Sequence, residues 1–303
     1  MTPGHPYAGD PHIAAWCVLL LAGLGVIAAH RRLSRREGEA TPWPPVQRAA
    51  FAGAWMAAAV ALTWPLADLA AHWSLVALVV QRLLLTLAVP SLVLLGTPYD
   101  VLGWLTRPAP VDAFLDWCRG PVKAVAVFTV AMVGSMSIPL VEAQGSSPVV
   151  RGILDLVVVA AGFVLWLPVI GRVPGMLRLR PVVRFAYLVI QAIVPAFLSF
   201  IYIFASHPLY STFSHSHQAI GLRPLNDQQI SGFVSKLSQL FVLLTVAAVV
   251  LKRAQPDEED SADEPLLWAD VERELERVDR RNERVTRDGP GSEAPTPPEG
   301  EGE

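Results

Sequence analysis

The sequence is poor in cysteine and in charged residues. Its two cysteines, Cys17 and Cys118, form no C-x-x-C or C-x-x-x-C pair, so neither a thiolate metal site nor a disulfide framework is indicated. Only 17% of the 303 residues are charged, whereas 52% are hydrophobic. The mean hydropathy is +0.41. These values exclude a disordered chain, disfavour a soluble domain and are typical of a polytopic membrane protein with polar ends.

Several functional signatures are also missing. No Lys or Arg precedes the first apolar run, so a cleaved secretory signal is not predicted. The apolar runs contain no paired-Asp motif, no H-E-x-x-H and no G-x-S-x-G elbow, and we therefore expect no enzymatic activity. We find no internal repeat of the kind that many transporters have.

Apolar runs near membrane-spanning length recur along the chain. They cover about residues 13–29, 49–69, 73–98, 122–141, 152–170, 182–206 and 230–251. A spanning helix takes about 20 apolar residues, and helices satisfy their own backbone in lipid. Basic residues crowd the loops after the first, third, fifth and seventh runs. We therefore predict an all-α membrane protein with seven transmembrane helices, its N-terminus outside and its C-terminus in the cytoplasm.

The chain is expected to divide by composition. The predicted parts are an extracytoplasmic segment (1–12), a transmembrane domain (13–252), an acidic linker (253–265), a cytoplasmic amphipathic helix (266–286) and a disordered tail (287–303). We expect the acidic stretch PDEEDSADEP to be disordered. The amphipathic helix is interpreted as a self-association or docking segment, or as a helix that is merely solvated.

The third run carries Gln81 and Arg82 near its middle. A charge at this depth costs about 3 kcal/mol on insertion scales. Arg82 either pairs with a carboxylate, snorkels towards the interface or replaces a functional residue of an ancestral site. Asp155 is a plausible partner, because a lone carboxylate in the fifth run would also be costly, and Asp68 and Glu142 are further candidates.

Histidines gather on the predicted outer side, whereas only His30 lies on the inner side. The outer set is His5, His12, His72, His207, His215 and His217. Loop histidines are commonly just solvated, but an imidazole-rich face can bind a metal such as copper. His207 is the best placed, because it stands at a predicted helix end.

Prolines interrupt four of the runs, at Pro90, Pro139, Pro168 and Pro195. A proline inside a helix kinks it and frees a carbonyl, which a neighbouring helix or water must satisfy. These prolines either shape the packing or open a cavity lined by backbone.

The segment GLRPLNDQQISG before the last run resembles a loop that enters a helix. Asn226 or Asp227 is predicted to cap that helix, with Gln228 and Gln229 in its first turn. The same polar residues would also suit a binding role at the outer face.

Four segments together resemble a known family. VVQRLLLTLAVPSLVLLGTP resembles the third span of the CtaG-type cytochrome c oxidase assembly proteins, which reads H-M-x-Q-H-x-L-L, then A-P-P, then L-x-L-G-x-P. SIPLVE, GFVLWLPVIGRVPG and PLNDQQISG resemble later segments of that family in the same order, so the resemblance covers roughly residues 43–252. It implies a seven-helix membrane protein linked to copper delivery or to the assembly of haem–copper oxidases.

The departures from the family pattern concern its histidines. Leu78 and Arg82 stand where the third span of the family has two histidines, and Ser137 stands in the H-x-P segment. Arg151 and Val157 replace the histidines expected near the start of the fifth span. A cationic Arg82 would repel a copper ion. The resemblance therefore supports the fold of the family more strongly than its metal chemistry.

We predict a membrane-embedded assembly factor for a haem–copper cytochrome c oxidase in the bacterial cell membrane. It would either handle copper at the outer face or act as a metal-free scaffold. The candidate copper ligands are His72, His207, His215 and His217, and the other candidate site residues are Gln81, Arg82, Asp155, Asp227 and Gln228. The expected partners are the lipid bilayer and oxidase subunits or other assembly factors. We do not expect the protein to bind nucleic acid. The alternative is a small-solute or anion transporter or channel.

Overall fold

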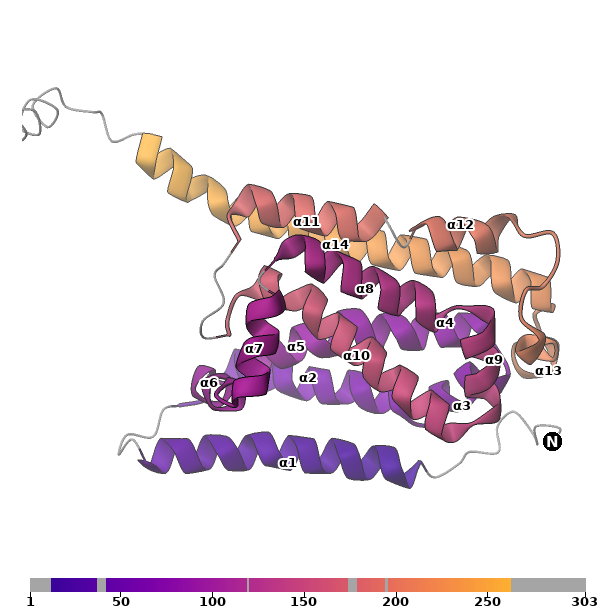
Figure 1. The fold of residues 1–303 in the computed structure, drawn as a ribbon, viewed down its shortest axis with the longest axis horizontal. Helices are drawn as coiled ribbons and strands as arrows, with labels where there is room; N and C mark the ends of the chain where they lie inside the picture. The colour runs from indigo at the N-terminus through magenta and orange to yellow at the C-terminus, as the bar shows by residue number, and fades with distance from the viewer. Residues whose placement is uncertain (1–11, 37–41, 119, 174–178, 194–195, 263–303) are drawn as a thin grey trace, which may run out of the picture. The chain divides into compact units, whose positions relative to one another are not determined.

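The computed structural model is all-helical over the residues that it describes, which are 12–36, 42–118, 120–173, 179–193 and 196–262 (Figure 1). The chain divides into two compact units, residues 1–252 and 253–303. The predicted amphipathic helix and tail lie outside the described residues, as does nearly all of the predicted N-terminal segment.

The helices run in chain order as α1 (Ile13–Arg36), α2 (Pro45–Leu62), α3 (Leu66–His72), α4 (Leu75–Leu83), η1 (Leu84–Ala88), α5 (Val89–Gly96), α6 (Tyr99–Thr106), α7 (Ala109–Cys118), α8 (Pro121–Ser135), α9 (Ile138–Ser146), α10 (Pro148–Ile170), α11 (Pro181–Ile193), α12 (Ala196–Phe204), η2 (Ser211–Phe213), α13 (Ser216–Ile220) and α14 (Pro224–Ala262).

The described residues contain six segments long and apolar enough to cross a membrane. They are Ile13–Arg35, Pro45–His72, Leu75–Gly96, Pro148–Ile170, Pro181–Phe204 and Pro224–Val249. Helices α8 and α9 pass the same test together, but bend by 60° at their junction. Pro139 lies in the first turn of α9, where proline is tolerated, and its ring disfavours continuation of α8. Six of the seven predicted runs thus correspond to candidate spans, and the fourth falls on the bent pair α8 and α9, so the count is six or seven.

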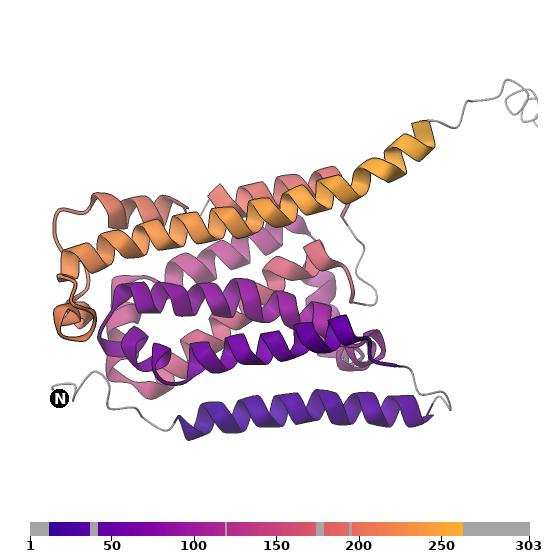
Figure 2. The same cartoon turned by 180° about the vertical axis from the view of Figure 1, so that it is seen from behind.

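The third span and α10 form the centre of the helix packing. Helix α2 packs against α5 and η1, and α10 packs against α5, α8, α9 and η1. The contact is close at Gly162 of α10, where an added Cβ would lie 2.7 Å from the carbonyl oxygen of Thr86. Helix α1 packs only loosely, against α2 and α6, and lies along the edge of the helices of the first unit (Figures 1 and 2).

The last helix is longer than the sequence pattern predicted. Residues 253–262 were expected to begin a disordered acidic linker, but α14 continues to Ala262. Glutamate, glutamine and alanine are good helix formers, and the extension of an existing helix avoids the cost of nucleation.

Candidate functional site

The third span is broken by a single π turn, η1, between α4 and α5. Pro90 has no N–H, and its ring clashes with the carbonyl four residues earlier, which belongs to Thr86. That carbonyl accepts a hydrogen bond from Nε1 of Trp166 on α10 at 3.0 Å. The hydroxyl of Thr86 donates in turn to the carbonyl of Arg82 at 2.7 Å. The prediction that a proline frees a carbonyl for a neighbouring helix is therefore confirmed at Pro90, and π turns are frequent at functional sites.

Arg82 lies in the last turn of α4, two residues before the π turn begins, and 1% of its surface is exposed. Its Nη1 forms an ion pair with Oδ1 of Asp155 on α10 at 2.6 Å, so the predicted pairing is confirmed. Its Nη2 donates to Oε1 of Gln144 on α9 at 2.7 Å. Among the described residues, neither Arg82 Nε nor Gln144 Nε2 has a hydrogen-bond partner. We call Arg82, Asp155 and Gln144 the Arg82 centre.

The Arg82 centre extends towards the start of α10. Arg151 lies one helical turn before Asp155, and its Nε is 3.5 Å from the carbonyl of Gln144. Its Nη2 lies 3.2 Å from Nε2 of His72 at the end of α3. The side chains thus form a polar path from His72 to the middle of the third span.

Gln81 plays a parallel role on the other side of α4. Its Nε2 donates to the carbonyl of Ala61 at 2.8 Å. Helix α2 ends at Leu62 and Pro65 follows, so this carbonyl has no N–H four residues later to accept from. Gln81 and Trp166 therefore both satisfy carbonyls that prolines leave free.

A small cavity adjoins the Arg82 centre. It measures about 20 Å³ and is lined by Arg82, Tyr202, Gln239 and several apolar side chains, including Met132 and Met136. A water molecule needs roughly 10 to 15 Å³ on this scale. The cavity can hold about one water molecule and no larger solute.

Asp227 caps a helix, but not its own. Helix α14 begins at Pro224, which suits a first helical position, so Asp227 falls within the first turn rather than before it. Its carboxylate instead accepts hydrogen bonds from the Ser74 hydroxyl (2.8 Å) and the N–H groups of Leu75 (2.7 Å) and Val76 (3.3 Å). Asp227 therefore caps α4 across the fold, and the prediction that it caps its own helix is wrong.

Gln228 anchors the segment that precedes α14. Its Oε1 accepts a hydrogen bond from the backbone N–H of Leu209 at 2.7 Å. Nearby, the Tyr210 hydroxyl donates to the carbonyl of Met136 at 2.6 Å. Burial raises the pKa of Tyr210, so its hydroxyl stays protonated and can donate. Gln228 and Tyr210 fix the histidine-bearing segment 205–223 to the helices.

The candidate copper ligands lie in different surroundings. His207 is exposed and its Nδ1 lies 3.3 Å from the Ser206 hydroxyl, while His72 contacts Arg151. His215 is exposed, and the side chain of His217 lies outside the described residues. In the described part of the chain, no group of three or more His, Cys, Asp or Glu side chains is arranged to hold a metal ion. The outer copper site stays a prediction.

The comparisons with known proteins agree with this architecture. The family model described as cytochrome c oxidase caa3 assembly factor (Caa3_CtaG) matches residues 25–255. The chain belongs to this family. No match is found among curated proteins or solved structures. The predicted membership of the CtaG-type family is confirmed, and the match covers all the candidate membrane spans except part of α1.

Within this assembly-factor family, the third span of the chain does not fit a copper ion. Leu78 is 1% exposed and packs in an apolar cluster with Val141. Arg82 carries a positive charge and offers no lone pair. Copper prefers imidazole, thiolate or thioether ligands, so the two positions that the resemblance assigns to histidine supply none.

Sequence reasoning missed three members of these sites, Gln144, Ser74 and Trp166. Gln144 had a usable signal, because an amide in a short apolar helix needs a polar partner. Ser74 directly precedes an apolar run, which is a helix-capping signal. Trp166 gave no signal, because its role depends on which carbonyl Pro90 frees.

Proposed function

We propose that this protein is a non-enzymatic assembly factor that acts inside the bacterial plasma membrane as a scaffold for a haem–copper cytochrome c oxidase. Family membership supports a role in oxidase assembly. The distribution of arginines among the loops supports an outer N-terminus and a cytoplasmic C-terminus.

The observation that carries the scaffold form of this proposal is the Arg82 centre. Arg82 stands where the resemblance places an intramembrane histidine, and it is held there by an ion pair with Asp155 and by the amide of Gln144. Such a centre fixes α4, α9 and α10 to one another, and it offers copper no imidazole or sulfur ligand. A scaffold needs a defined intramembrane shape, and this network holds helices at the centre of the packing in fixed positions.

The test is deletion of the chain in its host, followed by complementation. We expect loss of assembled oxidase, measured by the haem absorbance of membranes and by cytochrome c oxidation, with restoration by the wild-type chain. Added copper should not replace the chain, because a scaffold does not act by raising copper supply. Normal oxidase levels in the deletion strain would refute the assembly role, and full rescue by copper alone would refute the scaffold form.

Copper handling at the outer face is the second form of the function. The exposure of His207 and His215 favours it, because both imidazoles lie at the surface of one anchored segment. The test is the copper content of the purified full chain after loading and desalting, beside a His207→Ala/His215→Ala/His217→Ala variant. Stoichiometric copper that is lost in the variant would support this form, and equal copper in both would exclude it.

Transport is supported least by the geometry. The charge of Arg82 is paired with Asp155, and the adjoining cavity holds about one water molecule. We expect no solute flux in liposomes that contain the purified chain, and flux abolished by Arg82→Leu would reverse this conclusion.

A further inference from the structure

One face of α1 changes from apolar to basic along the helix. We call this face the α1 stripe, and its residues are Leu24, Ile27, Ala28, Arg31, Arg32 and Arg35. Residues 24, 28, 32 and 35, and residues 27 and 31, are spaced by three or four positions. The six residues therefore follow one side of the helix. Together they line an open groove of about 330 Å³.

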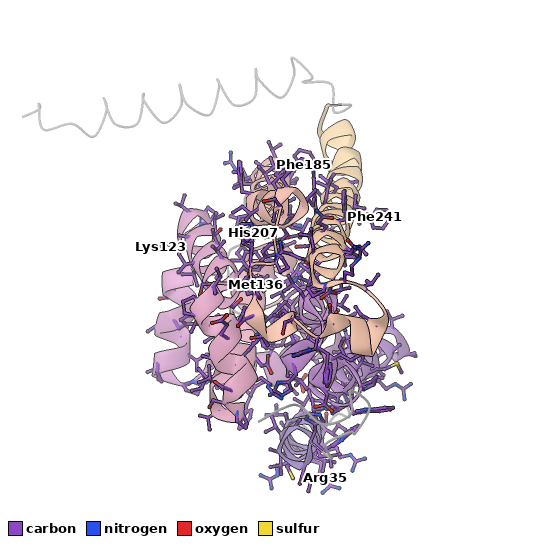
Figure 3. All side chains as sticks on the ribbon, turned by 90° about the vertical axis from the view of Figure 1, so that its right-hand side faces the viewer. Arg35, Lys123, Met136, Phe185, His207 and Phe241 are labelled. Carbon is purple, nitrogen blue, oxygen red and sulfur yellow. The ribbon has the colours of Figure 1, made fainter. Side chains whose placement is uncertain are left out.

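The α1 stripe lies largely outside the helix packing, because of its six residues only Ile27 is half-buried and the others are exposed. Helix α1 contacts the other helices through a different face, where Nε1 of Trp55 donates to the carbonyl of Leu19 at 2.9 Å. On that face His30 Nδ1 also lies 3.3 Å from Asp100. The three arginines of the stripe are exposed, and Arg35 lies at the outer edge of the helices (Figure 3). Within the described residues, no ion pair involves any of them.

The composition of the α1 stripe matches one kind of ligand. Guanidinium groups bind phosphate through paired hydrogen bonds, and basic clusters next to a spanning helix attract acidic lipids. The apolar half lies in the candidate span Ile13–Arg35, where a bilayer would place acyl chains beside it. An acidic peptide would contact only the arginines, whereas a lipid can contact the arginines and the apolar half of the groove at once.

We propose that the α1 stripe binds one acidic phospholipid, with the phosphate on the three arginines and an acyl chain along the apolar half. This site goes beyond the assembly role and does not depend on it. It would attach α1, which packs loosely, to a lipid of the leaflet at its basic end.

Native mass spectrometry of the full chain in a neutral detergent tests the proposal. The added lipid is palmitoyl-oleoyl phosphatidylglycerol, compared with the matching phosphatidylcholine. The stripe variant is Arg31→Gln/Arg32→Gln/Arg35→Gln. The matched control is Arg48→Gln/Arg107→Gln/Arg180→Gln, which removes the same charge from three exposed arginines predicted on the same side. Helicity and monodispersity are checked for both.

We expect one saturable phosphatidylglycerol on the wild type and on the control. Each arginine near an acidic lipid is worth roughly fivefold in affinity, so the stripe variant should bind at least roughly tenfold more weakly. Equal weakening in the control, or equal binding of phosphatidylcholine, would overturn the proposal. Glycerol phosphate binding as tightly as the lipid would also overturn it, because the acyl chain would then contribute nothing.

A second measurement keeps the natural arginines and does not depend on how the variants fold. A photocrosslinking side chain replaces Ala28 in the apolar half, and the chain is placed in vesicles with equal amounts of the two lipids. We expect phosphatidylglycerol to be crosslinked in at least roughly twofold excess over phosphatidylcholine. Crosslinking in the proportion of the bulk lipids would show only general lipid contact and would reject the site.

Discussion

Two carboxylates, Asp227 and Asp155, hold the two ends of α4 in different ways. Asp227 is fully buried and accepts hydrogen bonds from a hydroxyl and two backbone N–H groups at the start of the helix. Asp155 is partly buried and holds Arg82 near the end of the helix through one short ion pair. The first contact satisfies a helix terminus, whereas the second compensates a charge inside the membrane.

The two carboxylates differ in how their charge is stabilised inside the fold. The free N–H groups and the dipole of α4 stabilise the charge of Asp227, and the same contact satisfies donors that the helix cannot. The Arg82 centre removes two charges from water and still leaves Nε of Arg82 without a partner among the described residues. Asp227 is therefore a positioning contact, and the Arg82 centre is a costly network whose members depend on one another.

The comparison also relates to the family pattern. Asp227 and Gln228 match the D-Q pair of the family segment, while Arg82 departs from its histidine. The structure gives the matching pair a role that needs no metal: Asp227 fixes α14 to α4, and Gln228 fixes the preceding segment. The chain thus keeps the D-Q pair of the resemblance and has an arginine where the resemblance has a histidine.

Removal of Asp155 should have the largest effect. Asp155→Leu leaves Arg82 as an uncompensated charge, which costs about 3 to 5 kcal/mol in the free energy of unfolding. The measurement is reversible unfolding in mixed micelles with increasing denaturing detergent. In Arg82→Leu/Asp155→Leu most of the lost stability should return, because two well-packed apolar residues replace an ion pair at little net cost.

Glu142→Leu is the matched control for Asp155→Leu. Glu142 accepts a hydrogen bond from the exposed Ser211, so its loss should cost less than about 1 kcal/mol. Equal destabilisation by Asp155→Leu and Glu142→Leu would mean that the charge of Arg82 does not need Asp155 to compensate it. Asp155 would then not differ from Asp227 by compensating a buried charge.

Asp227→Asn should have an intermediate effect. The amide keeps one acceptor oxygen but replaces the other with a donor that faces an N–H group of α4. We expect a loss of about 1.5 to 3 kcal/mol, the range for hydrogen bonds to charged groups. Hydrogen exchange should also quicken at the first turn of α4, which a change confined to α14 would not produce.

The control for this prediction is Asn226→Ala, which removes a neighbouring polar side chain in the same turn of α14. The hydrogen bonds at the start of α4 involve Asp227 and Ser74, so this variant should leave the exchange rates at α4 unchanged. If both variants quicken exchange equally, the effect belongs to the stability of α14 and not to the cap.

Much of the fold could be predicted from the sequence, because the apolar runs of a membrane protein are long and its basic residues mark the loops. The Arg82–Asp155 pair was also predictable, since each charge needs a partner and few candidates lie in the apolar runs. The pairing was predicted because the apolar runs contain few carboxylates, and not because of the spacing of the two residues.

The role of Asp227 was not predictable from the chain alone. A residue that suits a cap lies near the start of a run, and local sequence cannot show that the capped helix begins about 150 residues earlier, at Ser74. The break in the fourth run was only partly predictable. Pro139 indicated a kink, but the bend of 60° depends on how α9 packs against α10.

The smallest expected effect concerns the π turn η1, which lies between α4 and α5. Trp166→Phe keeps most of the aromatic contact but removes the N–H that satisfies the carbonyl of Thr86. We expect a loss of about 1 kcal/mol, because polar contacts between membrane helices are individually modest. Trp73→Phe is a control with a similarly buried indole at 4% exposure, whose N–H donates no hydrogen bond within the part of the chain that the structure describes. If Trp166→Phe costs no more than the control, the carbonyl freed by Pro90 is satisfied without Trp166. The position of Arg82 would then depend on Asp155 and Gln144 and not on the contact between Trp166 and Thr86.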